Sequence, residues 1–315
     1  MDSSRKVAEI IDIAEAEIRK EYARSIGWLR RRRTIEVLTR LIAERKYQDL
    51  LDADGIERVA TVLSAAKSKA HRAAGKSVAD YIAGRLEEPV NYDRANALAV
   101  ARAEQNRYAM VQQITAEQKQ IIYDVITDGV RNGVNPKEMA RDFKGSIGLT
   151  QHQRKIVNNY RASLEAGSTD ALNRELRDRR FDSIVETAIE EDKKLPAAKI
   201  DQLVNAYERK FISHRAETIA RDAALQAAHQ GARDNWASAV QQGRITAEQV
   251  ERTWRHGPRR KHSRASHIAM NGQKRSLGEA FKTSDGVSIA YPGDPSAPPS
   301  ETIRCTCVVV TRLVR

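Results

Sequence analysis

The sequence predicts a mainly α protein, in which a multi-helix body precedes a small C-terminal α/β module that contains β-strands. Three observations lead to this fold class. Residues that break helices are few, with 16 Gly and 8 Pro among 315 residues. Apolar residues recur every three or four positions as far as Gly243, which is the spacing of one buried helix face. Beyond Gly243 the pattern becomes alternating, and loops rich in Gly, Pro and Ser interrupt it.

We expect three consecutive regions: an N-terminal helical region over 1–113, a central helical domain over 114–243 and a C-terminal basic α/β module over 244–315. In the first region, an apolar stripe through 5–47 predicts helix, with interruptions at Gly27 and at the four arginines 30–33. Further helices follow, with breaks expected near Gly75 and at 88–91.

Helix-start and helix-stop signals divide the central region. A capping box predicts that a helix begins at Thr115, and Gly133 is expected to end it. Asn135 followed by Pro136 predicts the next helix start, and a second capping box at Thr150 predicts another. After a break at Pro196, two helices are expected, over 198–212 and 214–241.

The C-terminal region contains the predicted strands. The segment 303–314 alternates and includes three consecutive valines, so it is the strongest candidate. The segments 287–291 and 253–256 are weaker candidates. The same region holds both cysteines and three of the seven histidines, so we expect any chemical site to lie here.

Two cysteines with one residue between them predict a metal site. Side chains two apart on a strand face the same way, so Cys305 and Cys307 are expected to point together. Two thiols aimed at one point suit a soft metal such as zinc, with His267, His262 or, less readily, Asp294 completing the ligand set. The alternative is that both cysteines simply pack the strand as small buried residues.

The charge distribution favours a polyanionic partner. The net charge is +12, and the stretch 232–315 contains 14 Lys and Arg against 7 Asp and Glu. Contacts to phosphate need only basic side chains at loose spacing. The candidates for such contacts are Arg255, Arg259, Arg260, Lys261 and Arg264. The alternative is a solvated basic surface that keeps the protein soluble.

The cysteine count and the apolar pattern indicate the compartment. Two cysteines exclude a disulfide framework. The N-terminal residues are charged and lack an apolar signal core, and no apolar run approaches the roughly 20 residues that span a bilayer. We therefore expect a protein that is made and folded in a reducing, cytosolic setting.

A series of motifs follows in a fixed order through the last third of the chain. They are RAETIARD at 215–222, Trp254, a basic loop at 259–264, HIAMNG at 267–272, Phe281, YPGDP at 291–295 and RCTC at 304–307. This order resembles the C-terminal signature of phage head morphogenesis proteins, the Mu F-like minor head protein family. The segment 147–161 is also similar to a stretch in relatives from short-tailed phages, so the resemblance covers about residues 114 to 315.

The chain departs from the family pattern at three motifs. The family's D-x-R-T-R element loses its acidic residue in the segment 259–264. Its N-C-R-C element becomes Arg304-Cys305-Thr306-Cys307, and Arg221-Asp222 stands where R-T-E is usual. These changes make the local charge more basic and leave the His and Cys positions intact.

The resemblance implies a structural virion protein, namely a minor head or head-morphogenesis component present in few copies inside the head near the portal vertex. It also implies presence in the host cytoplasm during assembly. The implied partners are the portal protein, major capsid or scaffold proteins, and packaged double-stranded DNA bound without sequence specificity. The implied roles are capsid assembly, DNA packaging or DNA ejection, and no catalytic residues are expected.

The alternative function is a metal-dependent nuclease or another DNA-acting enzyme that uses the C-terminal His/Cys cluster. His262, His267 and Asn271 beside two thiols resemble part of a His-Asn-His nuclease site. The acidic residue before the first His is missing, as are the downstream Asn and His. ADP-ribosyl transfer would need a Glu after a Ser-rich strand, which the sequence lacks, and Cys–His nucleophilic catalysis would need a group that orients the pair.

Overall fold

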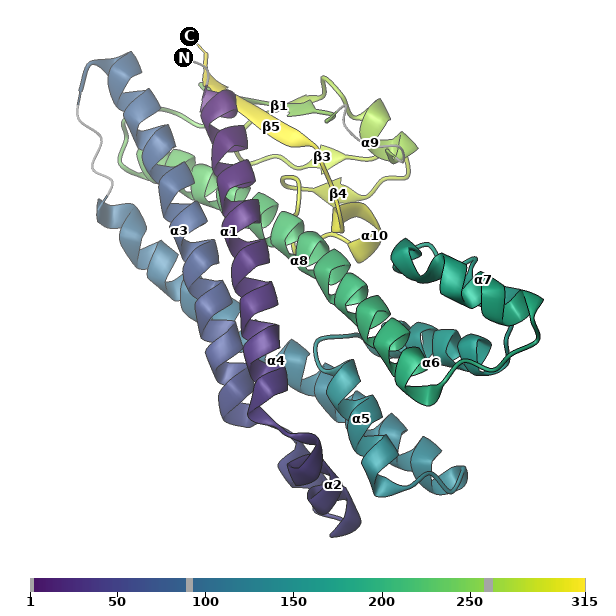
Figure 1. Cartoon of the computed structure of the whole chain (residues 1–315). Coiled ribbons are helices and arrows are strands. Elements are labelled where there is room, and N and C mark those ends of the chain that lie inside the picture. The colour runs from purple at the N-terminus through teal and green to yellow at the C-terminus, as the bar shows by residue number, and fades with distance from the viewer. Residues whose placement is uncertain (1–2, 89–92, 258–262, 315) are drawn as a thin grey trace. The chain divides into compact units, whose positions relative to one another are not determined.

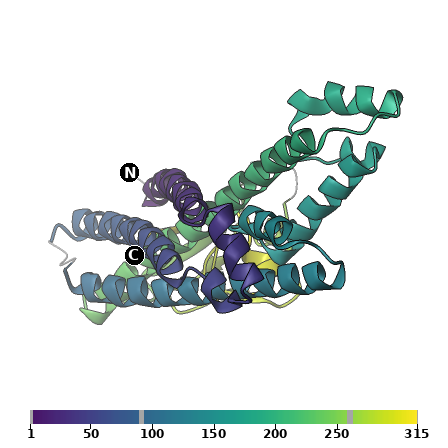
Figure 2. The ribbon, with the colours of Figure 1, turned by 60° about the horizontal axis from the view of Figure 1, so that its bottom comes forward.

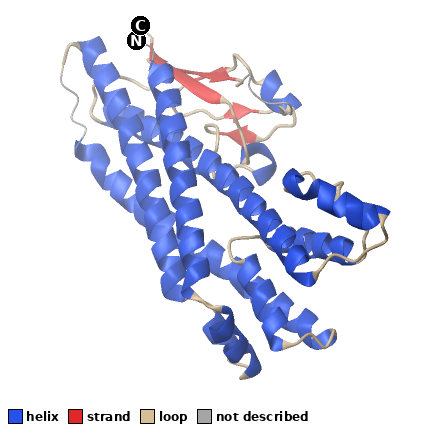
Figure 3. Ribbon diagram, in the orientation of Figure 1, coloured by secondary structure: helices blue, strands red, loops and turns tan. Residues whose placement is uncertain are grey.

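The computed structural model describes residues 3–88, 93–257 and 263–314, which form long helices followed by short strands (Figures 1 and 3). The long helices are α1 Ser3–Arg32, α2 Ile35–Ala43, α3 Ala53–Leu86, α4 Asp93–Arg131, α5 Pro136–Ser146, α6 Gln151–Glu165, α7 Asp182–Glu190 and α8 Ala197–Gln241. The C-terminal module contains β1 Val250–Arg255, α9 Ala265–Ala269, β2 Lys274–Arg275, β3 Phe281–Lys282, β4 Ser288–Ile289, α10 Pro299–Thr302 and β5 Val308–Leu313. The predicted fold class, mainly α with a small C-terminal α/β module, is confirmed. None of the described helices combines the length and apolar character that a membrane span requires.

The chain divides into two compact units, each built from separated segments. The first unit is Met1–Tyr22, Thr61–Tyr108 and Glu217–Arg315, and the second is Ala23–Ala60 and Ala109–Ala216. This division differs from the three consecutive regions expected from the sequence. The expected boundary after residue 113 falls inside α4, whereas the one at Gly243 falls just after α8, where this residue has a φ of +67°.

Two helix starts follow the local signals closely. The side chain of Asn135 accepts a hydrogen bond from Glu138 N at 3.0 Å, and Pro136 is the first residue of α5. Thr150 Oγ1 accepts from Gln153 N at 3.2 Å, and the Gln153 side chain accepts from Thr150 N at 3.0 Å. Both capping interactions lie within three residues, so they form regardless of tertiary context.

Four predicted helix breaks are wrong. Helix α1 runs through Gly27, α3 runs through Gly75, α4 runs through Thr115, and α8 continues as one 45-residue helix past Ile212. Buried residues continue the helical face across the expected break in α3, as Ala74 and Val78 do around Gly75, and in α8, as Ile212 and Ala216 do. A glycine costs a helix only about 1 kcal/mol, so packing of the flanking face outweighs it.

A three-stranded antiparallel sheet forms in the order β2-β1-β5, with Trp254 of β1 opposite Val309 of β5. The predicted strand at 303–314 is shorter than expected, because α10 and a left-handed Arg304 at φ +56° precede β5. Both cysteines therefore lie in an extended segment before the strand. The other two predicted strands correspond to β1 and β4, whereas the two-residue strands β2 and β3 were not predicted.

In the first unit, helices pack closely through small residues. Helices α1 and α3 run side by side there (Figures 1 and 2), and Lys69 of α3 forms an ion pair with Glu17 of α1 at 2.8 Å. On α8, Ala220, Ala224 and Ala228 are completely buried. Alanine lets a neighbouring backbone approach closely.

In the second unit, a buried arginine connects three helices. Arg154 of α6 is 3% exposed and contacts Asp142 of α5 at 2.6 Å and Asp128 of α4 at 3.3 Å. Hydrogen bonds to both carboxylates compensate the burial of the guanidinium and raise its pKa despite desolvation.

Candidate metal centre

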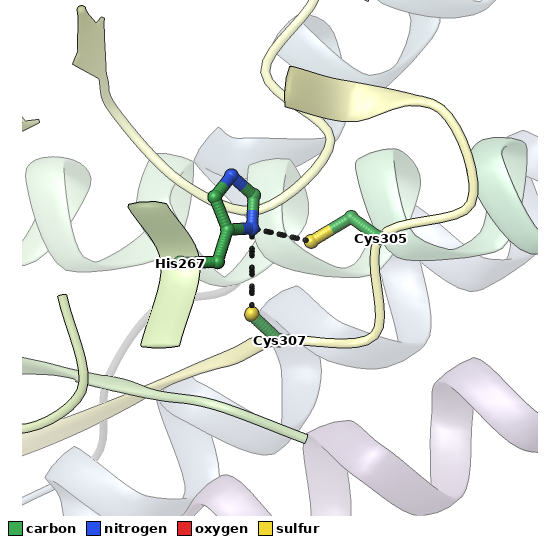
Figure 4. Close-up of side chains that lie close together, drawn as sticks. All are labelled: His267, Cys305 and Cys307. Carbon is green, nitrogen blue, oxygen red and sulfur yellow. Dashed lines mark hydrogen bonds between the residues drawn. The ribbon is translucent and has the colours of Figure 1, made fainter. Parts of the chain in front are cut away.

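Three potential metal ligands from two separated segments meet in the C-terminal module. Helix α9 carries His267, and the extended segment before β5 carries Cys305 and Cys307. Figure 4 shows the imidazole ring directed at the two sulfur atoms. Nδ1 of His267 lies 3.6 Å from Sγ of Cys305 and 3.5 Å from Sγ of Cys307. The three side chains are 2%, 1% and 2% exposed, and both thiols are free of disulfides.

These separations match a tetrahedral metal site. Zinc binds sulfur at about 2.3 Å and imidazole nitrogen at about 2.0–2.1 Å, so a tetrahedral angle separates the two ligand atoms by about 3.6 Å. The observed sulfur-to-nitrogen distances are 3.5 and 3.6 Å. The three ligand atoms all lie within 4.8 Å of one another, so they could bind one metal ion.

Helix α8 holds the cysteine segment in place through two adjacent residues. Arg221 Nε donates to the carbonyl oxygen of Cys305 at 3.3 Å. Asp222 Oδ1 accepts a hydrogen bond from Arg304 N at 2.6 Å. Arg221 also forms an ion pair with Glu15 of α1 at 3.0 Å, so the cysteine segment is connected to two helices of the first unit.

The two thiols differ in their proton affinity. A hydrogen bond from the Cys305 thiol lowers the pKa of Cys307, and the backbone N–H of Gly257 acts in the same direction. The same hydrogen bond, followed by burial, raises the pKa of Cys305. Gly257 is required for this close approach, because a Cβ there would lie 2.2 Å from the carbonyl oxygen of Thr306. A metal ion bound to both sulfurs would displace the shared proton.

A carboxylate lies on the far side of the imidazole ring. Nε2 of His267 is 2.9 Å from Oε2 of Glu301, but the carboxylate oxygen does not lie in the direction of an N–H bond, so the contact is electrostatic and not a hydrogen bond. Ser266 Oγ donates to the same carboxylate oxygen at 3.3 Å. A negative charge at this position favours the tautomer with its proton on Nε2, which leaves the Nδ1 lone pair facing the sulfurs.

Aromatic side chains close the centre on one side. The Trp254 ring packs edge-on against the His267 ring, with centroids 5.3 Å apart, and against Phe281 at the same distance. Trp254 and Phe281 are completely buried. This packing keeps water away from the three ligands.

Of the other predicted metal ligands, Asp294 does not join the centre. The Asp294 carboxylate accepts hydrogen bonds from Ala290 N at 2.7 Å and from Ser296 N at 2.9 Å, which closes the turn at 291–295. It therefore has a structural role in the turn, and its inclusion as a ligand was wrong. His262 lies outside the described residues.

The five residues predicted to contact nucleic acid differ in how they lie: one is exposed, one is held by hydrogen bonds within the protein, and three lie outside the described residues. Arg255 is exposed at the end of β1. Arg264 donates to the carbonyl oxygens of Ser300 and Ile303, the latter at 2.7 Å, so two of its nitrogens hold the α10 segment. Arg259, Arg260 and Lys261 lie outside the described residues.

Sequence reasoning missed a buried arginine and a carboxylate. Arg252 is 3% exposed and donates to the carbonyl oxygens of Leu277 and Glu279, both at 3.0 Å, and to that of Ala290. It thereby joins β1 to the two loops that flank β3 and β4. Neither Arg252 nor Glu301 carries a local sequence signal, because their partners lie 24 or more positions away.

Comparison of the chain with protein-family models, with characterised proteins and with solved structures found no match.

Proposed function

We propose that His267, Cys305 and Cys307 bind a zinc ion that stabilises the C-terminal module. The agreement between the observed ligand spacing and a tetrahedral Cys₂His set supports zinc over harder metals, which prefer oxygen ligands. Zinc bound here would connect α9 to the segment before β5. The two parts of the chain are 38 residues apart in sequence, so the metal would substitute for a larger apolar core.

The burial of the ligands supports a structural role for the metal. Catalytic zinc sites have three protein ligands and keep the fourth position open to water or substrate, whereas structural sites are closed by a fourth protein ligand, which is not among the described residues here. The three ligand side chains here are 1–2% exposed, and Trp254 covers the imidazole. The burial of the ligands supports a structural protein over the nuclease alternative, because a nuclease needs a metal that its substrate can reach.

We further propose that the chain is a structural virion protein, a minor component of a phage head located near the portal vertex. The residues that carry the resemblance to head morphogenesis proteins support this. Trp254, His267 and Phe281 form the core of the module, Asp294 closes its turn, and Cys305 and Cys307 contribute the thiols. The family signature therefore coincides with the residues on which this fold depends.

In this proposal, the basic C-terminal module contacts packaged DNA and the helices contact portal, capsid or scaffold proteins. Arg255 offers an exposed guanidinium for phosphate, and Arg259, Arg260 and Lys261 follow closely in sequence. Binding through phosphates alone is independent of sequence and falls steeply with salt.

Metal analysis of the purified full chain tests the zinc proposal. We expect about one zinc per chain in the wild type and loss of zinc in Cys305→Ser and His267→Ala. His152→Ala is the matched control, because His152 is exposed in the other unit. Equal, near-zero zinc in the wild type and in Cys305→Ser would refute the proposal.

Localisation in purified particles tests the virion proposal. Cryo-EM of the phage that encodes this chain should show it near the portal at low copy number, and its absence from purified particles would refute this role. DNA binding is tested separately by titrating random-sequence duplex across a salt series. A variant with Arg259, Arg260 and Lys261 replaced by Gln should bind more weakly and with a smaller salt dependence, whereas a salt-independent wild type would exclude phosphate contacts.

A further inference from the structure

One face of α4 carries a row of residues at heptad spacing, all of them within the second unit. The row, which we call the α4 stripe, alternates steps of four and three positions and consists of Gln112, Ala116, Lys119, Tyr123, Ile126 and Val130. Residues with this spacing stay on one side of a helix, over about 27 Å of its length here. It is also the spacing with which two helices pack against each other along their length.

The α4 stripe faces solvent although half of its side chains are large and apolar or aromatic. Tyr123 is 65% exposed and Val130 is 69% exposed. Lys119 is the only charged residue among the six, in a chain in which 30% of the residues are charged. Protein–protein interfaces are depleted in charged residues at their centre and enriched in aromatic ones. The composition of the stripe therefore favours a protein partner.

Two neighbouring residues of the stripe have no partner within the chain. Lys119 makes no ion pair or side-chain hydrogen bond with any of the described residues, and the Tyr123 ring has no aromatic or cationic neighbour among them. A lysine ammonium is attracted to the face of a tyrosine ring. The stripe thus presents both halves of a cation–π contact to another molecule.

We propose that the α4 stripe packs against the α4 stripe of a second copy of this chain, with the two helices antiparallel. In an antiparallel pair, the residues of one heptad position face those of the other position on the partner helix. A two-fold axis at the level of Ile121 places Lys119 against Tyr123 of the second copy. The symmetry repeats this contact, so each dimer contains two cation–π pairs.

The remaining residues of the stripe fit the same register. Ala116 lies opposite Ile126 of the second copy, which sets a small side chain against a large one. Gln112 lies opposite Val130 of the second copy. A parallel pair would instead bring Lys119 beside the same lysine of the second copy, and like charges repel. A second copy fits this face because one stripe supplies both halves of every contact.

The dimer is expected to be weak. A stable interface buries about 800 Å² on each partner, and six residues on one helix bury less than this. The helix itself is already held in the second unit by the buried Ile121 and Val125, so association does not have to order it. We therefore expect a dissociation constant in the micromolar to millimolar range. This inference does not depend on the proposed function.

Sedimentation equilibrium of the full chain, from micromolar to millimolar concentration, tests the proposal. We expect a monomer–dimer equilibrium that Tyr123→Ala weakens about 10-fold, because two cation–π pairs are lost. Tyr108→Ala is the matched control, since Tyr108 is 66% exposed on the same helix but precedes the stripe. The control should leave the equilibrium unchanged. A wild type that stays monomeric, or equal weakening in both variants, would overturn the proposal.

Cysteine cross-linking tests the orientation of the two helices. Gln113 and Gln120 are exposed beside the stripe and lie seven positions apart. In the antiparallel pair, Gln120 lies next to the two-fold axis and near its own copy, whereas Gln113 lies two turns away, opposite Thr127 of the second copy. Under mild oxidation, Gln120→Cys should form a disulfide-linked dimer and Gln113→Cys should not. The wild type is the blank, because both of its thiols are buried. Equal behaviour of the two variants would overturn the antiparallel pair.

Discussion

Asp222 and Arg304 are 82 positions apart, yet Asp222 Oδ1 accepts a hydrogen bond from the backbone N–H of Arg304 at 2.6 Å. Arg304 has a left-handed backbone conformation with a φ of +56°, which side chains other than glycine rarely adopt. The carboxylate of α8 thus holds the backbone in the conformation that directs Cys305 toward His267.

This relationship predicts a role for Asp222 in metal binding. Asp222→Ala should lower zinc affinity about 10-fold or more, because the removal of groups that orient metal ligands typically costs 10–100-fold. Competition with a chromophoric chelator measures the affinity, and far-UV circular dichroism checks that the helices remain. Asp285→Ala, at an exposed position in the β3–β4 turn, is the control and should not change the affinity. Unchanged zinc affinity in Asp222→Ala would show that the cysteine segment needs no support from α8.

Arg252 is predicted to be essential for the stability of the C-terminal module. Arg252→Lys should lower the free energy of unfolding by about 2–4 kcal/mol, because one ammonium group cannot reach all the carbonyl oxygens that the guanidinium serves. Urea unfolding followed by Trp fluorescence measures the change. Arg255→Lys, on the same strand but exposed, should change stability by less than about 0.5 kcal/mol. A similar loss in both variants would contradict the assignment.

Two helical glycines predict opposite effects of the same substitution. A Cβ at Gly231 of α8 would lie 2.1 Å from the carbonyl oxygen of His71 on α3, so Gly231→Ala should destabilise the protein by about 1–3 kcal/mol or more. A Cβ at Gly84 of α3 would meet no atom within 4 Å, so Gly84→Ala should raise stability by up to about 1 kcal/mol. Thermal unfolding of both variants measures the difference, and the same sign in both would disprove the close approach of α3 and α8.

Lys67 predicts a pH dependence of stability. Its Nζ donates to Asn106 Oδ1 at 3.0 Å and to Gln226 Oε1 at 2.9 Å, and burial lowers its pKa from 10.5 to about 8. The folded state therefore binds fewer protons than the unfolded state between pH 8 and 10.5, so stability should rise with pH across this window. Across the whole window the free energy of unfolding should rise by about 3 kcal/mol. Below pH 8 the buried ammonium is charged in the folded state, and the free energy of unfolding is lower by this amount.

Comparison of variants isolates this effect from other titrating groups. Urea unfolding at several pH values should show that Lys67→Met lacks the rise between pH 8 and 10.5. Lys76→Met is the control, because the side chain of Lys76 is 65% exposed and pairs with Asp80. The control should retain the wild-type pH dependence. An identical dependence in the wild type and Lys67→Met would mean that the ammonium is solvated in the folded state.

The candidate metal ligands could be predicted in part from the sequence. Two cysteines with one intervening residue point the same way in any extended segment, and this local geometry led to Cys305 and Cys307 without a correct strand boundary. His267 was one of two histidines considered, and α9 places it beside the sulfurs, whereas His262 lies outside the described residues. Asp294 was included for its chemistry, but hydrogen bonds within its own turn occupy its carboxylate.

The sequence by itself determined the features that depend on neighbours a few residues apart. These are the helical fold class, the caps at Asn135 and Thr150, and the pairing of the two thiols. Only the tertiary structure decided whether a helix continues through Thr115, and which residues support the metal centre from α8 and α10. The physical reason is that burial and long-range hydrogen bonds, such as that between Asp222 and Arg304, depend on chain segments with no local sequence signature.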